Sequence, residues 1–174
     1  GADLTNSGAV TASQPFGILT VTGNYTQTAS GILSSTAAGP VAGTAYGQLK
    51  VQGTVSLNGS VQLEAIYPAQ PGDTFRILDQ IPAAAIMGTF LGRPEGDIVA
   101  FGPHRVQVSY RGGSGNDFVL TTTAPKALVS NVSHPLASSG IVDYEFTVSL
   151  SSPASTPLTY HYETRDLTAA AGLD

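Results

Sequence analysis

Apolar and polar residues alternate along most of this chain. Leu19 and Val21, for example, are separated by threonine. A period of two is the pattern of a half-buried β-strand, because successive side chains point to opposite faces. No window keeps the i, i+3, i+4, i+7 spacing of an amphipathic helix, so the sequence predicts an all-β fold. Further pairs of this kind are Leu49/Val51, Val55/Leu57, Val61/Leu63, Phe75/Ile77, Val106/Val108 and Phe118/Leu120.

The alternating pattern also repeats. Leu19 to Leu33 reads LTVTGNYTQTASGIL and Leu49 to Leu63 reads LKVQGTVSLNGSVQL, and both begin L-x-V-x-G. Leu19 and Leu49 are thirty residues apart. A period of this length indicates a solenoid, in which a strand, a glycine corner and a second strand form a coil that stacks on the next coil. About three coils are needed, because one coil cannot bury its own apolar face. Less regular strands follow from Gly72 to Thr122. We therefore expect the terminal coils of a β-solenoid with a cap over residues 1–123, with a β-sandwich as the alternative.

A second segment begins after a short linker. The alternation stops in TTTAPKA, Thr121 to Ala127, which is polar and contains a proline. Beyond it, apolar residues from Val142 to Leu150 alternate with polar ones, and Leu158, Tyr160 and Tyr162 predict a further strand. The sequence thus predicts a second domain over residues 127–174.

Composition restricts the function. Only 11% of the residues are charged, against about 25% in ordinary globular proteins. The 20 glycines and 11 prolines suit short strands and turns. Cysteine is absent, which excludes disulfides, a thiolate nucleophile and a cysteine metal site. Low charge with abundant Gly, Thr and Val is common in secreted β-rich surface proteins, so we expect an extracellular location.

Charge and hydropathy also limit the partners. The net charge of −5 argues against nucleic acid, which requires clustered Lys and Arg. No apolar run approaches the roughly 18 residues of a membrane span, so we expect no transmembrane segment. The chain starts at Gly1 and not at a methionine, which predicts a piece of a longer protein.

One stretch matches a metal-binding motif. Gly112 to Leu120, GGSGNDFVL, fits the calcium-binding nonapeptide G-G-x-G-x-D-x-U-x of parallel β-rolls, with Asp117 as the candidate ligand. A β-roll stacks several such nonapeptides, however, and this chain has one. Two glycines between strands also suit a tight hairpin with positive φ. We therefore predict a hairpin here, with calcium as the alternative. Asn58-Gly59 likewise predicts a hairpin turn.

Residues 17–122 resemble the closing repeats of bacterial β-strand-repeat surface proteins, which are autotransporter- or adhesin-like β-solenoids. The resemblance rests on the two repeats and, in order, on PGDTFRILDQ, MGTFLGRPEG and VSYRGGSGNDFVLT. It implies a non-catalytic structural or adhesive protein at a bacterial cell surface, either a piece of a long surface protein or a subunit of a cell-surface fibre or filament.

Residues 127–174 resemble the N-terminal half of a Calx-β domain. The opening strand, the FTVSL strand, the alternating tyrosine strand and the AGLD ending follow the order of that family. The resemblance implies a partial immunoglobulin-like sandwich, and some members bind calcium. Asp166 and Asp174 match acidic family positions and Glu163 lies close by, so these three are calcium candidates. Leu136-Ala137 stands where the family often has Glu-Gly, which removes one ligand from a cation that requires six to eight oxygens.

This second segment is short for such a sandwich. Only 48 residues follow Lys126, whereas the fold needs about 100 residues and seven strands. Half a sandwich leaves a strand edge and an apolar face uncovered. We expect the missing strands to come from the rest of the same long chain or from a neighbouring copy by β-strand exchange.

Signals for catalysis are few. His104, His134 and His161 are scattered, and neither H-E-x-x-H nor G-x-S-x-G occurs. A carbohydrate-active β-helix enzyme would need a groove of acids, but acids beside Gly and Pro are ordinary turn residues. We expect no enzymatic activity, and a calcium- or glycan-binding module is the alternative function. The groove candidates would be Glu64, Asp73, Asp79 and Arg76, with Arg93 to Asp97 (RPEGD) as a ligand loop.

Overall fold

The computed structural model describes residues 1–12, 16–133, 143–154 and 157–163. Every regular element in these residues is a β-strand, so the predicted all-β class is confirmed. Within the same residues, no helix has the length and apolar character required to cross a bilayer.

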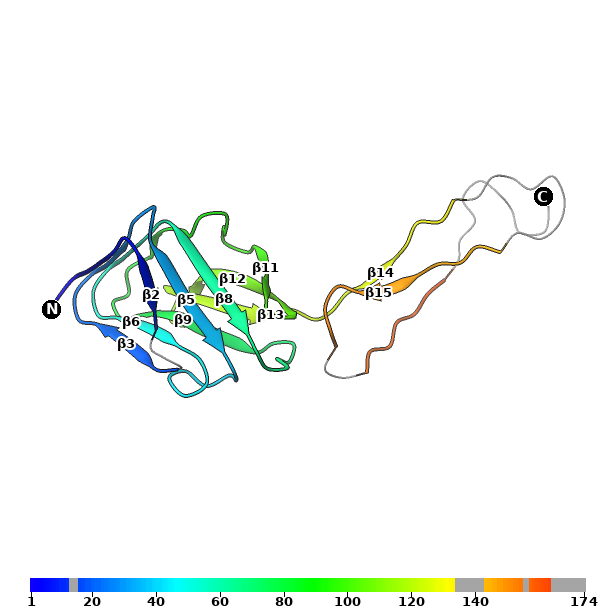
Figure 1. The fold of residues 1–174 in the computed structure, drawn as a ribbon, viewed down its shortest axis with the longest axis horizontal. Helices are drawn as coiled ribbons and strands as arrows, with labels where there is room; N and C mark the ends of the chain where they lie inside the picture. Colours follow the sequence, from blue (N-terminus) through cyan, green and yellow to red (C-terminus); the bar gives the residue numbers. More distant parts are fainter. Residues whose placement is uncertain (13–15, 134–142, 155–156, 164–174) are drawn as a thin grey trace.

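The chain makes three successive passes, here called coils, and each coil adds one strand to each of three sheets. Figure 1 labels the strands of the second and third sheets. The first coil holds β1 (Leu4–Asn6), β2 (Ala9–Thr11) and β3 (Ile18–Val21). The second holds β4 (Tyr25–Gln27), β5 (Ile32–Ala37) and β6 (Gln48–Val51). The third holds β7 (Val55–Leu57), β8 (Ser60–Ala65) and β9 (Thr74–Gln80). Strands of neighbouring coils pair in parallel in all three sheets.

The register confirms the first half of the predicted repeat and corrects the second half. Leu19 pairs with Leu49, which continues to Leu78 in the third coil. Leu33, however, pairs with Val61 and not with Leu63. The reason is that the corner after β4 is two residues longer than the corner after β7.

The Asn58-Gly59 corner corrects a second prediction. It joins β7 to β8, which belong to different sheets, so it does not form a hairpin. Gly59 has φ +62°, and a Cβ built on it would lie 2.3 Å from the Gly31 carbonyl oxygen of the coil beside it. Glycine is therefore required here by backbone conformation and by close stacking of the coils.

Antiparallel strands cover the far end of the third coil. β11 (Ile98–Phe101), β12 (His104–Gly112) and β13 (Asp117–Thr122) extend the third sheet in the order β9-β13-β12-β11. β10 (Met87–Gly88) adds a short parallel strand beside β7. The turn at Gly102 lies against the end of β8, because a Cβ there would be 2.1 Å from the Ala65 carbonyl oxygen.

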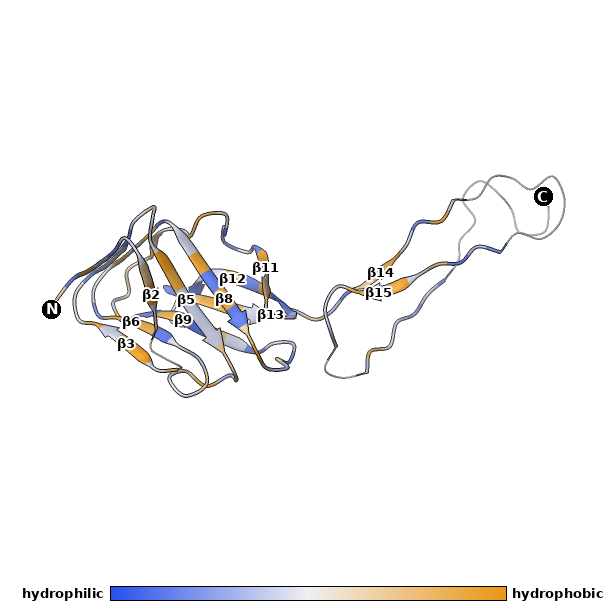
Figure 2. Ribbon diagram, in the orientation of Figure 1, coloured by the Kyte–Doolittle hydropathy of each residue, from blue (hydrophilic) through white to orange (hydrophobic). Residues whose placement is uncertain are grey.

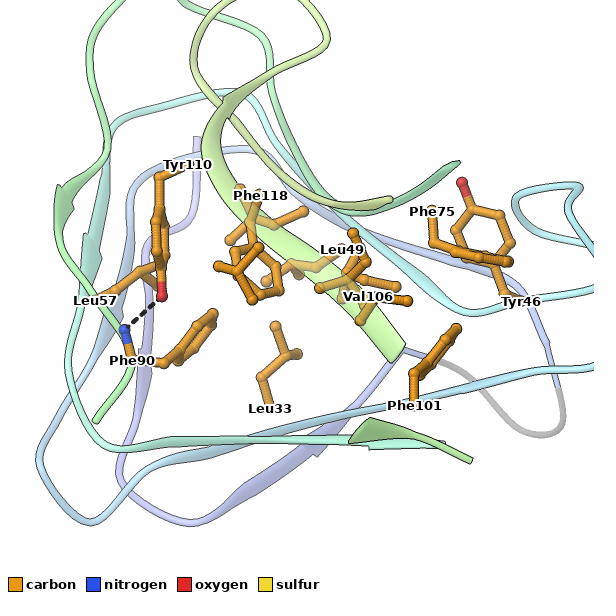
Figure 3. Packing of buried hydrophobic residues seen from close by; sticks show 14 of the residues in the cluster. Leu33, Tyr46, Leu49, Leu57, Phe75, Phe90, Phe101, Val106, Tyr110 and Phe118 are labelled. Atoms are coloured by element: carbon orange, nitrogen blue, oxygen red, sulfur yellow. Dashed lines mark hydrogen bonds between the residues drawn. The ribbon is translucent and has the colours of Figure 1, made fainter. Parts of the chain in front are cut away.

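The space between the sheets is filled by apolar side chains (Figure 3). Phe75 and Phe101 meet edge to face with ring centroids 5.0 Å apart, and Phe90 and Phe118 do the same at 5.0 Å. Such pairs stabilise a core beyond the area that they bury. The hydropathy colouring shows the alternation as orange and pale bands along the strands (Figure 2).

Two amides interrupt this apolar interior. Asn6 and Gln27 occupy neighbouring inward positions of β1 and β4 and are only 3% and 2% exposed. Asn6 Nδ2 donates to Gln27 Oε1 (3.3 Å), and Gln27 Nε2 donates to the carbonyl oxygens of Asn58 and Ser60 in the next coil (both 2.8 Å). The two side chains therefore bond three coils together from inside.

Gln27→Leu is expected to lower the free energy of unfolding by about 2 kcal/mol, because buried carbonyls lose their donor. Leucine is the replacement of choice because it is apolar, and Leu57 occupies the next inward position of this sheet. Urea unfolding measures the change, and Gln62→Leu, at an exposed glutamine of β8, should change it by less than about 0.5 kcal/mol. Equal effects of the two substitutions would contradict an interior role for the Gln27 amide.

The second segment forms one antiparallel hairpin, β14 (Ala127–Val129) with β15 (Val148–Leu150), drawn beyond β13 in Figure 1. These strands are shorter than predicted, and residues 157–163 form no regular strand, contrary to the prediction for Leu158 to Tyr162. A two-stranded ribbon has little to pack against, which limits strand formation. Its apolar side chains stay open to solvent: Val129 is 62% and Val148 is 64% exposed.

Candidate functional site

The glycine-rich motif forms the turn of a hairpin, as predicted. β12 and β13 are antiparallel, with Gly112 opposite Asp117. Gly113 and Gly115 have φ values of +55° and +100°. A residue with a side chain rarely adopts such values, so the glycines are needed for the turn itself.

Asp117 lies at the centre of this turn with no exposed surface. Its Oδ1 accepts the backbone N–H of Gln80 (2.9 Å), and its Oδ2 accepts that of Ser114 (3.2 Å). The guanidinium of Arg76 is 3.4 Å from Oδ2. A Cβ on Gly113 would lie 2.0 Å from the same oxygen. The carboxylate thus attaches the turn to β9 through protein donors. The Arg76 guanidinium stands beside Asp117 Oδ2, where a calcium ion would have to lie if Asp117 were its ligand.

Asn116 completes the attachment. It is 4% exposed, and its Nδ2 donates to the carbonyl oxygens of Gln80 (2.9 Å) and Pro82. Its Oδ1 accepts the hydroxyl of Ser114 at 2.7 Å. Asp117 accepts the N–H of Gln80 and Asn116 donates to its carbonyl oxygen, so the N-D pair of the motif bonds the hairpin to both backbone groups at the end of β9.

A cavity of about 430 Å³ lies beside the turn, along β6, β9 and β13. Arg76 Nη1 is 3.2 Å from Asp79 Oδ1, and Lys50 Nζ is 4.0 Å from Asp79 Oδ2. The volume falls within the range of small-ligand pockets, and the charges suit a polar ligand. Its lining residues are Pro40, Ala42, Tyr46, Gln48, Thr74, Arg76, Asp79, Gly113 and Val119. We call it the β9 groove.

Only part of the hypothetical acidic groove is brought together. Arg76 and Asp79 both line the β9 groove. Glu64 is exposed on β8, in another sheet. Asp73 Oδ2 accepts the hydroxyl of Tyr67 (3.0 Å) and the N–H of Gln70 (2.8 Å), which stabilises the turn before β9.

The RPEGD loop is held against β12. Glu95 accepts the hydroxyl of Ser109 (2.7 Å) and the N–H of Tyr110 (2.6 Å). Arg93 and Asp97 form an ion pair at 3.7 Å, and Tyr110 donates its hydroxyl to the Arg93 carbonyl (2.7 Å). These contacts use the charged groups of the loop to fix its shape.

The histidines do not form a common site. His104 is 6% exposed, and its Nε2 accepts the N–H of Ala69 at 3.1 Å. His161 is exposed. His134 lies outside the described residues.

The Calx-β calcium candidates are not assembled within the described part of the chain. Glu163 is exposed, and Asp166 and Asp174 lie outside the described residues. No group of three His, Cys, Asp or Glu side chains with metal-binding geometry occurs within residues 1–12, 16–133, 143–154 and 157–163. Asp117 has the protein partners given above. These contacts do not test calcium binding, and the calcium hypothesis stays a prediction.

Tyr110 gives the fold a dependence on alkaline pH. Burial raises its pKa to about 12, and its hydroxyl accepts the N–H of Phe90 (3.0 Å, Figure 3). The folded state favours the neutral phenol, so this stabilisation is complete below pH 10 and is lost as pH rises from 10 to 12.

We expect the free energy of unfolding to fall by about 2 to 3 kcal/mol over this interval from Tyr110 alone. Urea unfolding at successive pH values measures the slope. Tyr110→Phe should make the fall of the unfolding free energy with pH less steep. A residual slope is expected because burial also raises the pKa of Tyr25 and Tyr46. An unchanged slope in Tyr110→Phe would contradict the assignment.

Comparison with known proteins identifies no relative: no family model, no curated protein and no solved structure matches this chain.

Proposed function

We propose that this chain is a non-catalytic structural or adhesive module of an extracellular bacterial surface protein, in which residues 1–123 are the closing coils of a β-solenoid. The observation that carries the proposal is the difference between the two ends of the body. Three parallel sheets begin at β1, β2 and β3, whereas antiparallel strands cover the opposite end. Stacked coils of this kind form elongated scaffolds whose binding surfaces are edges and outer faces.

The side-chain chemistry supports the same proposal. Charged groups of the Gly-rich turn and of the RPEGD loop are used to hold backbone segments together. The buried polar side chains Asn6, Gln27 and Asn116 bond to carbonyls of neighbouring strands. Polar groups that are used in this way stabilise a fold and are poorly placed to act on a substrate.

The second segment supports association with a neighbour. Its hairpin exposes apolar side chains on a two-stranded ribbon, and such a ribbon is marginally stable by itself. We propose that residues 127–174 form part of a Calx-β sandwich whose remaining strands come from a neighbouring segment or copy by β-strand exchange. The partner would thus be the same long chain or a second copy in a fibre.

Light scattering and electron microscopy of the purified chain test association. Elongated or end-joined particles are expected, and their formation should weaken when Val148→Lys and Phe146→Lys place charges on the exposed ribbon. Gln62→Lys, on the exposed face of β8, is the matched control and should leave association unchanged. A stable, strictly monomeric particle at high concentration would contradict strand exchange.

The β9 groove favours a second candidate function, the binding of a polar ligand such as a surface glycan. Arg76 and Asp79 project donors and acceptors into a cavity of suitable volume. A glycan array with wild-type protein and with Asp79→Ala tests it, and only loss of a signal in the variant supports the groove. Titration with millimolar calcium, followed by thermal unfolding, tests the metal version of this candidate, which predicts a higher midpoint.

A further inference from the structure

We propose that one further coil of parallel strands, carried by the same polypeptide ahead of Gly1, stacks on β1, β2 and β3. This inference deepens the proposed structural function and rests on it. Three features of the first coil support it: a column of glycines, the exposure of inward side chains and two columns of polar groups.

The glycine column consists of Gly8, Gly31 and Gly59, each of which directly precedes a strand of the second sheet in the observed register. A Cβ on Gly31 would lie 2.4 Å from the Asn6 carbonyl oxygen, and one on Gly59 would lie 2.3 Å from the Gly31 carbonyl oxygen. At Gly31 and Gly59, glycine is therefore required by a backbone oxygen of the preceding coil. A Cβ on Gly8 meets no heavy atom within 4 Å in the described part of the chain. The carbonyl of a further coil would explain why this corner also has a glycine.

Inward side chains of the first coil are incompletely covered. Leu4, Val10 and Leu19 pack against the core but are only partly buried. Their partners in the second coil, Tyr25, Leu33 and Leu49, are each 0% exposed. Another coil of the same cross-section would bury these side chains in the same way that the first coil buries the second.

Polar columns indicate the chemistry of the added coil. The side chain of the earlier coil accepts from the backbone of the later one: Asp3 Oδ1 accepts the Asn24 N–H (2.8 Å), and Asn24 Oδ1 accepts the Thr54 N–H (2.9 Å). We expect Asp, Asn, Ser or Thr at this corner of the added coil, because each offers a side-chain oxygen. Inside, the amide of Asn6 donates to Gln27 Oε1. An inward amide on the added coil would donate to Asn6 Oδ1 in the same direction.

The path of residues 1–3 favours a covalent connection over a second copy. Ala2 accepts the N–H of Gly23 (2.9 Å) and donates its own N–H to Thr22 Oγ1 (2.9 Å). Thr22 and Gly23 directly follow β3. Residues 1 and 2 therefore stack on the corner that follows β3. A preceding strand stacked on β3 would lead directly into Gly1.

An extended chain tests this inference. A copy of residues 25–51, which spans β4 to β6, is placed directly before Gly1, and Gly8→Ala is introduced into both the extended and the original chain. We expect Gly8→Ala to lower the thermal midpoint by less than about 2 °C in the original chain and by more than about 6 °C in the extended one. Gly31→Ala is the matched control and should lower the midpoint in both chains.

Hydrogen exchange gives a second measurement on the same proteins. The amides of β1, β2 and β3 are expected to become at least about tenfold more protected in the extended chain than in a chain carrying a scrambled 27-residue extension. Equal protection in the two chains, or an equal effect of Gly8→Ala with and without the added coil, would overturn the proposal. A dimer of the original chain that Gly8→Ala dissociates would also overturn it, because the occupant would then be a second copy.

The proposed function can fail independently. Enzymatic turnover or ligand binding in the β9 groove would contradict a purely structural role and would leave the Gly8 comparison unchanged.

Discussion

Asp117→Ala is expected to lower the free energy of unfolding by about 4 kcal/mol. The side chain is fully buried. Its loss leaves the N–H groups of Gln80 and Ser114 without their acceptor and removes the anion beside Arg76. The Gln80 N–H is buried, so without an acceptor it costs its full desolvation free energy, which is why the cost exceeds that of one hydrogen bond. Urea unfolding of the purified variant measures it.

Asp79→Ala is the matched control, because Asp79 contacts the same arginine at 3.2 Å. Arg76 and Lys50, the cations beside it, are partly exposed, so the change should cost less than about 1 kcal/mol. Similar losses in the two variants would show that the turn does not depend on a buried anchor. A midpoint that rises with calcium in wild-type protein and not in Asp117→Ala would restore the metal interpretation of the motif.

Gly59→Ala is expected to cost a similar amount, about 4 kcal/mol, for two separable reasons. The residue has φ +62°, which costs an alanine roughly 1–2 kcal/mol. The added methyl group would also lie 2.3 Å from the Gly31 carbonyl oxygen and 2.5 Å from that of Thr28. Backbone atoms of a stacked coil cannot move aside without breaking the ladder of hydrogen bonds, so the remainder of the cost is steric.

Gly92→Ala separates the two contributions. Gly92 has φ +68°, and a Cβ there meets no heavy atom within 4 Å among the described residues. It should therefore cost only the conformational part, about 1 kcal/mol. Thermal or urea unfolding of both variants gives the difference, and a difference below about 1 kcal/mol would contradict close stacking of the coils at this corner.

The sequence predicted the strands of the body well, because alternation of side chains is a local property of each strand. Leu19 over Leu49 and the hairpin at Gly112 followed directly from repeated letters and from glycines. The pairing of Leu33 was predicted two residues away from its observed partner, since the length of a corner is not visible in the strands on either side. Asn58-Gly59 was assigned to a hairpin because a local turn signal does not state whether the next strand returns to the same sheet.

The candidate groove shows the same limit. Arg76 and Asp79 could be named from the sequence as possible partners. The contact of Arg76 with Asp117, however, depends on the pairing of β9 with β13, strands far apart in the chain. The inward amides Asn6 and Gln27 had one local signal, since they are polar residues at the inward positions of an alternating strand. Their hydrogen bonds join three coils and become visible only in the assembled structure.

The sequence by itself thus determined the all-β class, the positions of many strands and the need for glycine at particular turns, because these depend on side-chain alternation and on allowed backbone angles. The tertiary structure decided the parallel stacking in three sheets, the antiparallel cover at one end, and the assignment of Asp117 and Asn116 as anchors of a hairpin. These features depend on contacts between residues far apart in the chain, such as Leu4 with Tyr25, which are 21 positions apart, and Thr121 with Thr74, which are 47 positions apart. Only the folded arrangement specifies which carbonyl lies over which glycine and which donor faces which carboxylate.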